Sequence, residues 1–236
     1  MIEFNSEVTD VIRRTHNVKS FRFKVNEGVE FKAGQFFFVA IDINGEEQRK
    51  PFSFSSSPTE KGYVEFTKRI TESEFSEALD GIEPGAKAKL QMPYGKFTLE
   101  ENKKIAFLSG GIGITPIRSM FKYATDNKLP VDMVLLYGNN TEEDIVFKED
   151  FDQMQGANDN LRVIYTLTDP DVCPAPGTCK TGRIDACMIK EEIPDFDERV
   201  FYLCGPPGMV ACLTEILKEE LKLTEECVRT EQFAGY

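Results

Sequence analysis

The chain has 236 residues, 41% of them hydrophobic and 29% charged, enough for one large domain or two small ones around a packed core. Its formal net charge of −12 would repel the phosphates of nucleic acid. No run approaches the roughly 18 apolar residues of a membrane span. The composition therefore argues against a nucleic-acid-binding protein and against a membrane-spanning one.

The N-terminal residues lack the basic segment and the long apolar stretch of a signal peptide, so we expect a cytoplasmic protein. Six cysteines occur without a CxxC pair and without the tight spacing of plant-type iron–sulfur domains. Most of them are expected to be free thiols, and a disulfide or metal site at Cys173 and Cys179 is the alternative. His16 is the only histidine, which nearly excludes histidine-based catalysis and His-rich metal sites.

The first hundred residues are typical of β-structure. Short apolar or alternating runs occur at residues 20–25, 35–43, 63–69 and 88–91. Turn-forming residues such as Gly, Pro and Asn separate these runs, and one helical turn is expected at residues 76–79. Short strands at regular spacing predict a β-sandwich or an antiparallel β-barrel.

From Lys104 onward the pattern alternates between apolar strands and amphipathic helices. The expected strands are residues 105–109, 131–137, 161–167, 199–204 and 228–233, and the expected helices are residues 116–127, 147–153, 185–192 and 208–221. Such alternation predicts an α/β domain with a parallel sheet that is covered on both faces. We place the boundary in a charged stretch, which gives domains at residues 1–102 and 103–236.

The run Ser109-Gly110-Gly111-Ile112-Gly113-Ile114-Thr115-Pro116 follows the first strand of the second domain. Its glycines permit a sharp turn and a close ligand, Thr115 can cap the next helix, and Pro116 suits the first helical position. The helix N-terminus would favour an anionic pyrophosphate. A strand-to-helix turn that needs glycine only for geometry is the alternative, because proline stands where the dinucleotide fingerprint has its third glycine.

The sequence resembles the ferredoxin–NADP reductase superfamily over nearly its whole length. Five motifs occur in the order that the family shows. They are Lys50-Pro51-Phe52-Ser53, Pro93-Tyr94-Gly95-Lys96-Phe97, Gly111-Ile112-Gly113-Ile114-Thr115-Pro116, Cys204-Gly205-Pro206-Pro207-Gly208-Met209 and Glu231-Gln232-Phe233. The resemblance implies a β-barrel flavin domain followed by an α/β nicotinamide domain.

The resemblance assigns the first two motifs to the flavin, including Pro51 and Gly95. Phe52 would pack on one face of the flavin ring, and Ser53 would hydrogen-bond its N5 atom. Lys50 would pair with the phosphates in place of the family's arginine, as a point charge rather than a fork. Phe52 replaces a tyrosine, so looser flavin binding is expected, and an ordinary core aromatic is the alternative.

A further flavin-phosphate contact in the family comes from a Gly-x-x-Ser/Thr turn that opens a short helix. Ser73-Glu74-Phe75-Ser76 occupies this place, with Ser73 in the position of the glycine. Ser76 is therefore a predicted phosphate contact, and a simple N-cap is the alternative.

The last two motifs imply the nicotinamide site. Cys204 would lie beside the nicotinamide with Gly205 and Pro206, shaping hydride transfer rather than acting as a nucleophile; a buried structural thiol is the alternative. Phe233 would cover the second flavin face, unless Tyr236 does so or contacts the adenine. Glu231 would orient the nicotinamide or relay a proton, and a solvated carboxylate is an equal alternative.

The end of the strand at residues 161–167 bears on the choice between NADH and NADPH. Asp169 would repel a 2′-phosphate and can accept hydrogen bonds from a ribose diol, which favours NADH. Lys180 and Arg183 follow a loop and could reach the same pocket, which would favour NADPH.

Together these features imply an oxidoreductase that passes electrons from NAD(P)H through bound FAD, or less commonly FMN, to a separate acceptor protein. A ferredoxin-like protein, an oxygenase component or another subunit would be that acceptor. The alternatives are a free flavin reductase, a non-catalytic flavin electron-transfer subunit, and a regulatory module with empty sites.

Overall fold

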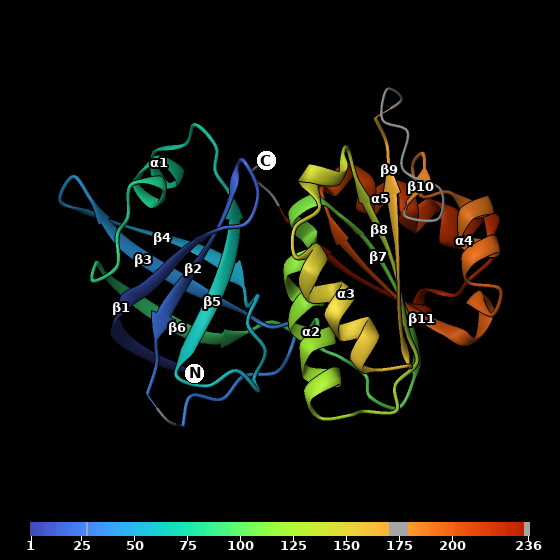
Figure 1. Ribbon diagram of the computed structural model, residues 1–236, viewed down its shortest axis with the longest axis horizontal. Helices are drawn as coiled ribbons and strands as arrows, with labels where there is room; N and C mark the ends of the chain where they lie inside the picture. Colours follow the sequence, from blue (N-terminus) through green and yellow to red (C-terminus); the bar gives the residue numbers. More distant parts are fainter. Residues whose placement is uncertain (27, 170–178, 234–236) are drawn as a thin grey trace. The chain divides into compact units, whose positions relative to one another are not determined.

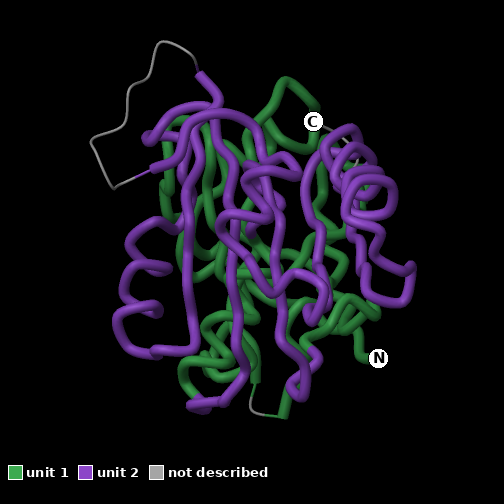
Figure 2. The backbone as a smooth tube through the Cα atoms, turned by 90° about the vertical axis from the view of Figure 1, so that its right-hand side faces the viewer, with its two compact units in different colours: residues 1–99, 115–126 green, residues 100–114, 127–236 purple. Residues whose placement is uncertain are grey.

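The computed structural model describes residues 1–26, 28–169 and 179–233. The chain divides into two compact units (Figure 2). The first contains residues 1–99 together with the helix at residues 115–126, and the second contains residues 100–114 and 127–236. A helix that follows the glycine-rich loop in sequence is thus part of the first unit.

The first unit is built on a six-stranded antiparallel sheet in the order β4-β3-β6-β1-β2-β5 (Figure 1). Its strands are β1 (Ile2–Arg13), β2 (Val18–Lys24), β3 (Phe36–Ile43), β4 (Glu46–Ser53), β5 (Tyr63–Arg69) and β6 (Lys87–Tyr94), and one short helix, α1 (Glu74–Asp80), follows β5. Strands β4 and β5 end this order, so they are the edge strands of the sheet.

Aromatic side chains fill the core of this sheet. Phe21, Phe23 and Phe66 are fully buried, and Phe66 stacks on Phe21 with ring centroids 5.0 Å apart. Alternate residues of most of the strands supply this core, as the period of two predicts. The four predicted runs are found as β2, β3, β5 and β6, whereas β1 and β4 lie outside them.

The second unit contains a six-stranded parallel sheet in the order β10-β9-β8-β7-β11-β12. Its strands are β7 (Lys104–Gly110), β8 (Met133–Asn139), β9 (Leu161–Leu167), β10 (Lys180–Thr181), β11 (Arg199–Gly205) and β12 (Val228–Gln232). The order reverses between β7 and β11, and open α/β sheets bind ligands at the carboxyl ends of strands at such a switch point.

Helices cover both faces of this parallel sheet. Side chains of α4 (Ala186–Glu192) and α5 (Pro207–Glu215) pack on one face, in a core that includes Leu108 and Leu203. On the other face, Phe151 of α3 (Lys148–Ala157) packs against Tyr137. The predicted fold class, an antiparallel barrel-like domain followed by a parallel α/β domain, is confirmed.

Helix boundaries differ in detail from the prediction, and α3 extends to Ala157 rather than to residue 153. The helix after the glycine-rich loop, α2, spans Thr115–Asp126. The last helix is shorter than expected, because α5 ends at Glu215 and a π-helical turn (Ile216–Glu220) completes the segment. Among the described residues, no helix has the length and apolar character that crossing a membrane would need.

Candidate functional site

The first flavin motif lies at the end of the edge strand β4. Lys50 and Pro51 are exposed, Phe52 is half-buried and Ser53 is buried. The Arg49 guanidinium lies 3.7 Å from the centroid of the Phe38 ring, so Arg49 is stacked on the sheet. Because successive strand residues point to opposite faces, Lys50 is expected to point away from that stack.

Phe52 already has an aromatic partner within the first unit. Its ring stacks on Phe66 with centroids 4.1 Å apart and an interplanar angle of 15°, and it also contacts Phe75. The side chain remains half-buried, so the core covers only part of it. Phe52 therefore joins the core, as the alternative reading proposed, and keeps exposed surface on which a ligand ring could pack.

Lys68 and Arg69 are two cations at the end of the other edge strand, β5. Neither was predicted from the sequence as a site residue. Burial lowers the pKa of Lys68, whose Nζ donates to the Arg69 carbonyl oxygen at 2.8 Å. The Nε of Arg69 is buried and has no hydrogen-bond partner. A buried donor without a partner is costly, and a phosphate oxygen is a strong acceptor for a guanidinium. Arg69 therefore fits an anionic group such as the FAD diphosphate.

The turn before α1 is held by its own serines. Ser73 is the N-cap, and its hydroxyl accepts a hydrogen bond from the Ser76 backbone N–H. Ser76 is fully buried, and its hydroxyl accepts from the Thr71 backbone N–H at 2.8 Å. Ser76 thus has a local structural role, and its contact with a flavin phosphate stays a prediction. Gly95 follows β6 in an exposed turn with φ 95°.

The glycine-rich loop connects β7 to α2 through one 3₁₀ turn (Gly111–Ile114). Gly111 has φ 52°, a conformation that favours glycine, and its carbonyl oxygen accepts from the Tyr137 hydroxyl at 2.9 Å. A Cβ atom on Gly113 would lie 2.4 Å from the Cys204 carbonyl oxygen. Thr115 and Pro116 are buried and open α2. Only glycine at residue 113 lets the loop lie this close to β11.

Cys204 lies at the carboxyl end of β11, beside the loop. In the strand register it is opposite Ser109 of β7 and Glu231 of β12, and the Ser109 hydroxyl donates to its carbonyl oxygen at 3.1 Å. Burial, with the nearby Glu231 charge, raises the pKa of the Cys204 thiol well above its usual value. The sulfur is therefore held as a neutral thiol, which suits a packing surface and does not suit a nucleophile.

The end of β12 brings two more predicted residues to the same place. Burial raises the pKa of Glu231, so its protonated form is favoured compared with an exposed carboxyl group. The Phe233 backbone N–H donates to the Gly205 carbonyl oxygen at 3.3 Å, and the Phe233 side chain is half-buried. Cys204, Gly205, Glu231 and Phe233 are thus brought together, and Pro206 follows as the N-cap of α5. Tyr236 lies outside the described residues.

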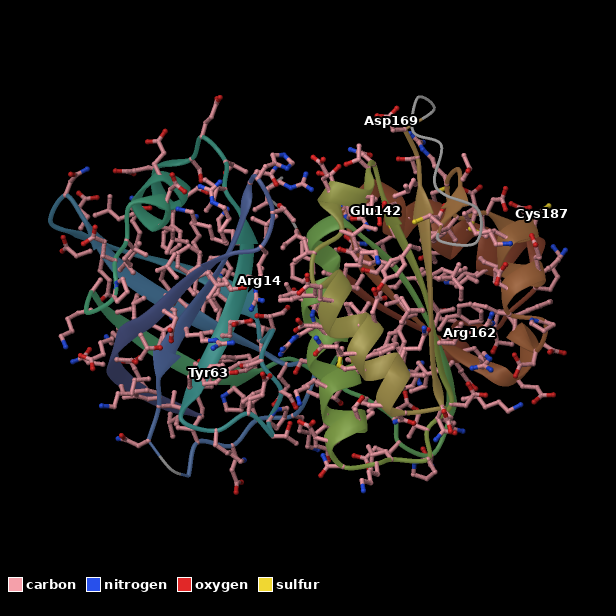
Figure 3. All side chains as sticks on the ribbon, viewed as in Figure 1. Arg14, Tyr63, Glu142, Arg162, Asp169 and Cys187 are labelled. Atoms are coloured by element: carbon pink, nitrogen blue, oxygen red, sulfur yellow. The ribbon has the colours of Figure 1, made fainter. Side chains whose placement is uncertain are left out.

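Asp169, one of the residues predicted to select the nucleotide, follows the carboxyl end of β9 (Figure 3). The Asp169 backbone N–H donates to the Asn140 carbonyl oxygen at 3.1 Å. Lys180 is paired with two carboxylates of α4, Glu191 at 2.9 Å and Glu192 at 2.6 Å. The Lys180 charge is therefore neutralised by the protein itself, whereas Arg183 is exposed.

Asn139, at the carboxyl end of β8, is a third residue that was not predicted from the sequence. Its side-chain amide nitrogen and oxygen are both buried and lack hydrogen-bond partners. Only its buried position could have singled it out. Cys173 lies outside the described residues, and within the described part of the chain no cluster of His, Cys, Asp and Glu could hold a metal ion.

Two domain families match the chain. The oxidoreductase FAD-binding domain matches residues 5–99, and the oxidoreductase NAD-binding domain matches residues 107–215. The flavin motif of β4 thus falls in the first match, and the glycine-rich loop with Cys204 falls in the second.

Individual proteins agree with these matches. The glycine betaine monooxygenase reductase subunit of Chromohalobacter salexigens is 27% identical over 91% of this chain, which spans 60% of that relative's length. NADH-cytochrome b5 reductase 1 of Dictyostelium discoideum is 30% identical, over 84% of this chain and 71% of that protein. The FAD/NAD-binding domain of nitric oxide dioxygenase from Vibrio cholerae has the same fold, with a TM-score of 0.85, 18% identity and coverage of 97% and 98%.

Proposed function

Since the chain belongs to the ferredoxin–NADP reductase superfamily of flavin-dependent oxidoreductases, we propose that it passes electrons from NADH through FAD to a separate acceptor protein. The observation that carries this proposal is the construction of the β7–β11 switch point. A glycine loop leading to a helix N-terminus and a buried thiol meet there, within the match to the NAD-binding domain.

In the first unit, the proposed role of the β4 and β5 edges is to hold FAD. Lys50, Lys68 and Arg69 would bind the diphosphate, because the described part of the chain provides no carboxylate for these cations. Phe52 would pack against the flavin ring, and Ser53 would hydrogen-bond it. Bound FAD supplies the hydride acceptor and releases electrons singly or in pairs.

In the second unit, the proposed role of the loop is to bind the nucleotide pyrophosphate. Backbone N–H groups of the 3₁₀ turn, which leads toward a helix N-terminus, favour an anion there. Cys204 would give the nicotinamide an uncharged wall, since its thiol stays protonated. Glu231, whose pKa is raised by burial, would orient the carboxamide. These residues orient a ligand and exclude water.

The proposed electron donor is NADH rather than NADPH. Asp169 would repel a 2′-phosphate at the end of β9. The ion pairs of Lys180 with Glu191 and Glu192 remove one of the two cations that would favour NADPH. We place the activity in the cytoplasm as part of this proposal, because that compartment supplies NADH.

The acceptor is proposed from the relatives. A glycine betaine monooxygenase reductase subunit and an NADH-cytochrome b5 reductase are both named for the reduction of a protein partner. We accordingly propose an oxygenase component or another small redox protein as the acceptor. A free flavin reductase remains the second candidate, and it predicts that FAD exchanges readily with solution.

Anaerobic titration of the purified protein, first with NADH and then in a separate sample with NADPH, tests the proposal. We expect a protein with bound FAD whose visible flavin absorbance is bleached stoichiometrically by NADH and more slowly by NADPH. A protein that binds FAD and stays oxidised in both titrations would be a non-catalytic electron-transfer subunit. A protein that binds no FAD at any concentration would contradict the function altogether.

A further inference from the structure

Helix α2 is fastened to the segment that follows the flavin motif, within the first unit. The Arg118 guanidinium donates to the Ser55 carbonyl oxygen at 2.9 Å and to both carboxylate oxygens of Glu60, at 2.5 and 3.3 Å. One residue further along α2, the Ser119 hydroxyl donates to the Ser56 carbonyl oxygen at 2.7 Å. Two consecutive helix residues thus contact two consecutive backbone carbonyls.

Glu60 is held on its other sides as well. The Tyr63 hydroxyl, at the start of β5 (Figure 3), donates to Glu60 at 2.8 Å, and the Ser57 backbone N–H donates at 2.7 Å. Burial alone would raise the pKa of Glu60, but Arg118 and these donors outweigh it and hold the pKa below its usual value. The carboxylate is therefore ionised and directed at Arg118.

The serine segment is also fixed from the opposite side. The Ser55 hydroxyl donates to Glu65 at 2.8 Å, and the Glu65 backbone N–H donates to the Ser56 hydroxyl at 2.9 Å. Glu65, only 1% exposed, is paired with Arg14 and Arg22. Arg118 therefore contacts a rigid segment that begins two residues after Ser53.

Stability alone does not explain an arginine at this position. The side chains of Arg118 and Glu60 are only 7% and 14% exposed. Burying such a pair costs much of what the pair returns, and apolar residues of similar size often stabilise a fold as well. A forked guanidinium, however, accepts only a narrow range of positions for its partners. The ion pair thus defines where α2 lies along its axis far more sharply than apolar packing would.

We propose that Arg118, with Glu60 and Ser119, is a positioning residue that sets the distance between Ser53 and the N-terminus of α2. The proposal rests on the proposed function, in which Ser53 contacts the flavin and the start of α2 binds the nucleotide. Hydride transfer is sensitive to such spacing, since a misplacement of about 1 Å can cost on the order of a hundredfold in rate.

The test uses Arg118→Met combined with Glu60→Gln, which removes the ion pair and leaves no unpaired buried charge. Lys122→Met is the matched control, because Lys122 lies one turn further along the same helix and, among the described residues, pairs within α2, with Asp126. The measurements are FAD content, the affinity for ADP-ribose, the flavin reduction rate at saturating NADH, and hydrogen exchange of α2 amides without nucleotide.

We expect the double variant to retain FAD and to bind ADP-ribose within about twofold of the wild type. Its reduction rate at saturating NADH should fall at least tenfold, and amides at the start of α2 should exchange faster. Arg118→Lys should restore part of the rate, and Lys122→Met should match the wild type. A folded double variant that is reduced at the wild-type rate would overturn the positioning role.

Ser119→Ala keeps the proposal testable if the double variant does not fold. It removes one hydrogen bond and should slow reduction two- to fivefold with unchanged ADP-ribose affinity; a wild-type rate would again overturn the role. Failure of the proposed function is a different result, because the wild-type protein itself would then not be reduced by NADH.

Discussion

The two ends of the parallel sheet in the second unit are built from different chemistry. At the amino end, Arg199 of β11 donates to both carboxylate oxygens of Asp132, at 3.0 and 2.9 Å, and to those of Asp195, at 2.7 and 3.0 Å. It also donates to the Ile105 carbonyl oxygen, and Lys104 joins through Asp195. At the carboxyl end, residues 109–114 and 203–208 contain five glycines, two prolines and no charged residue.

This difference separates stability from ligand binding. A buried guanidinium with its donors satisfied joins β7 and β11 at one end, where no ligand is expected. At the other end lie glycine-rich backbone and a neutral thiol, and the N–H groups of a helix N-terminus favour an anionic ligand. Substitutions at the amino end should therefore change the free energy of unfolding, and those at the carboxyl end should change nucleotide binding.

The largest expected effect is the loss of the amino-end cluster in Arg199→Met. The substitution removes several charged hydrogen bonds and leaves Asp132 without its arginine and Asp195 with Lys104 as its cation, so unfolding should become about 2–3 kcal/mol easier. Denaturation followed by circular dichroism measures it. ADP-ribose affinity of the folded protein should change by less than about twofold. A large loss of affinity without a loss of stability would break the division between the two ends.

The second effect is expected at the carboxyl end, from Gly113→Ala. The new Cβ would lie 2.4 Å from the Cys204 carbonyl oxygen, so the loop must move away from β11. Because the helix N-terminus then shifts from its ligand, ADP-ribose affinity should fall at least tenfold, measured by calorimetry. Gly156→Ala on α3 is the control, since its Cβ would meet no atom within 4 Å. Equal affinity in both variants would show that the loop does not bind the pyrophosphate.

Most of the carboxyl end could be predicted from the sequence, because it depends on short-range rules. Apolar runs define β7 and β11, and a glycine-rich run before Thr115 and Pro116 indicates a strand-to-helix turn. These features need no knowledge of distant contacts. The resemblance then supplied the roles that geometry alone leaves open.

What the sequence could not predict depends on partners far apart in the chain. β1 alternates charged and apolar residues too irregularly to signal a strand, and its pairing with β2 and β6 defines it. In the sequence, Arg118 is an ordinary polar residue of an amphipathic helix, because its partner Glu60 lies 58 residues away. Arg69 is likewise an ordinary strand residue in the sequence, whereas in the structure its Nε is buried without a hydrogen-bond partner.

Asp169, which follows β9 at the carboxyl end of the sheet, should affect the choice between NADH and NADPH. Asp169→Arg replaces a repelling carboxylate with a guanidinium that can pair with a 2′-phosphate. The ratio of kcat/KM for NADPH to that for NADH should rise about tenfold, since charge-assisted hydrogen bonds contribute about 1.5–3 kcal/mol. Lys180→Met is the control, because Lys180 is already paired with Glu191 and Glu192 and should not change the ratio. An unchanged ratio in Asp169→Arg would place selectivity elsewhere.

The smallest effect concerns Glu231, a carboxyl group beside the uncharged segments at the carboxyl end of the sheet. Its pKa is raised by burial, so the folded state binds its proton more tightly than the unfolded state does. Stability must then fall as the pH rises from the ordinary glutamate pKa through the raised one, and the penalty persists above it.

Glu231→Gln removes the penalty. The variant should therefore unfold at a higher temperature than the wild type at pH 7. The gain in its free energy of unfolding should be smaller than the roughly 1 kcal/mol typical of single substitutions. The two proteins should converge below about pH 4, where an ordinary glutamate is protonated as well. Thermal unfolding between pH 3.5 and 8 measures the difference, and a gap that is independent of pH would mean that Glu231 is as well solvated as an ordinary surface carboxylate.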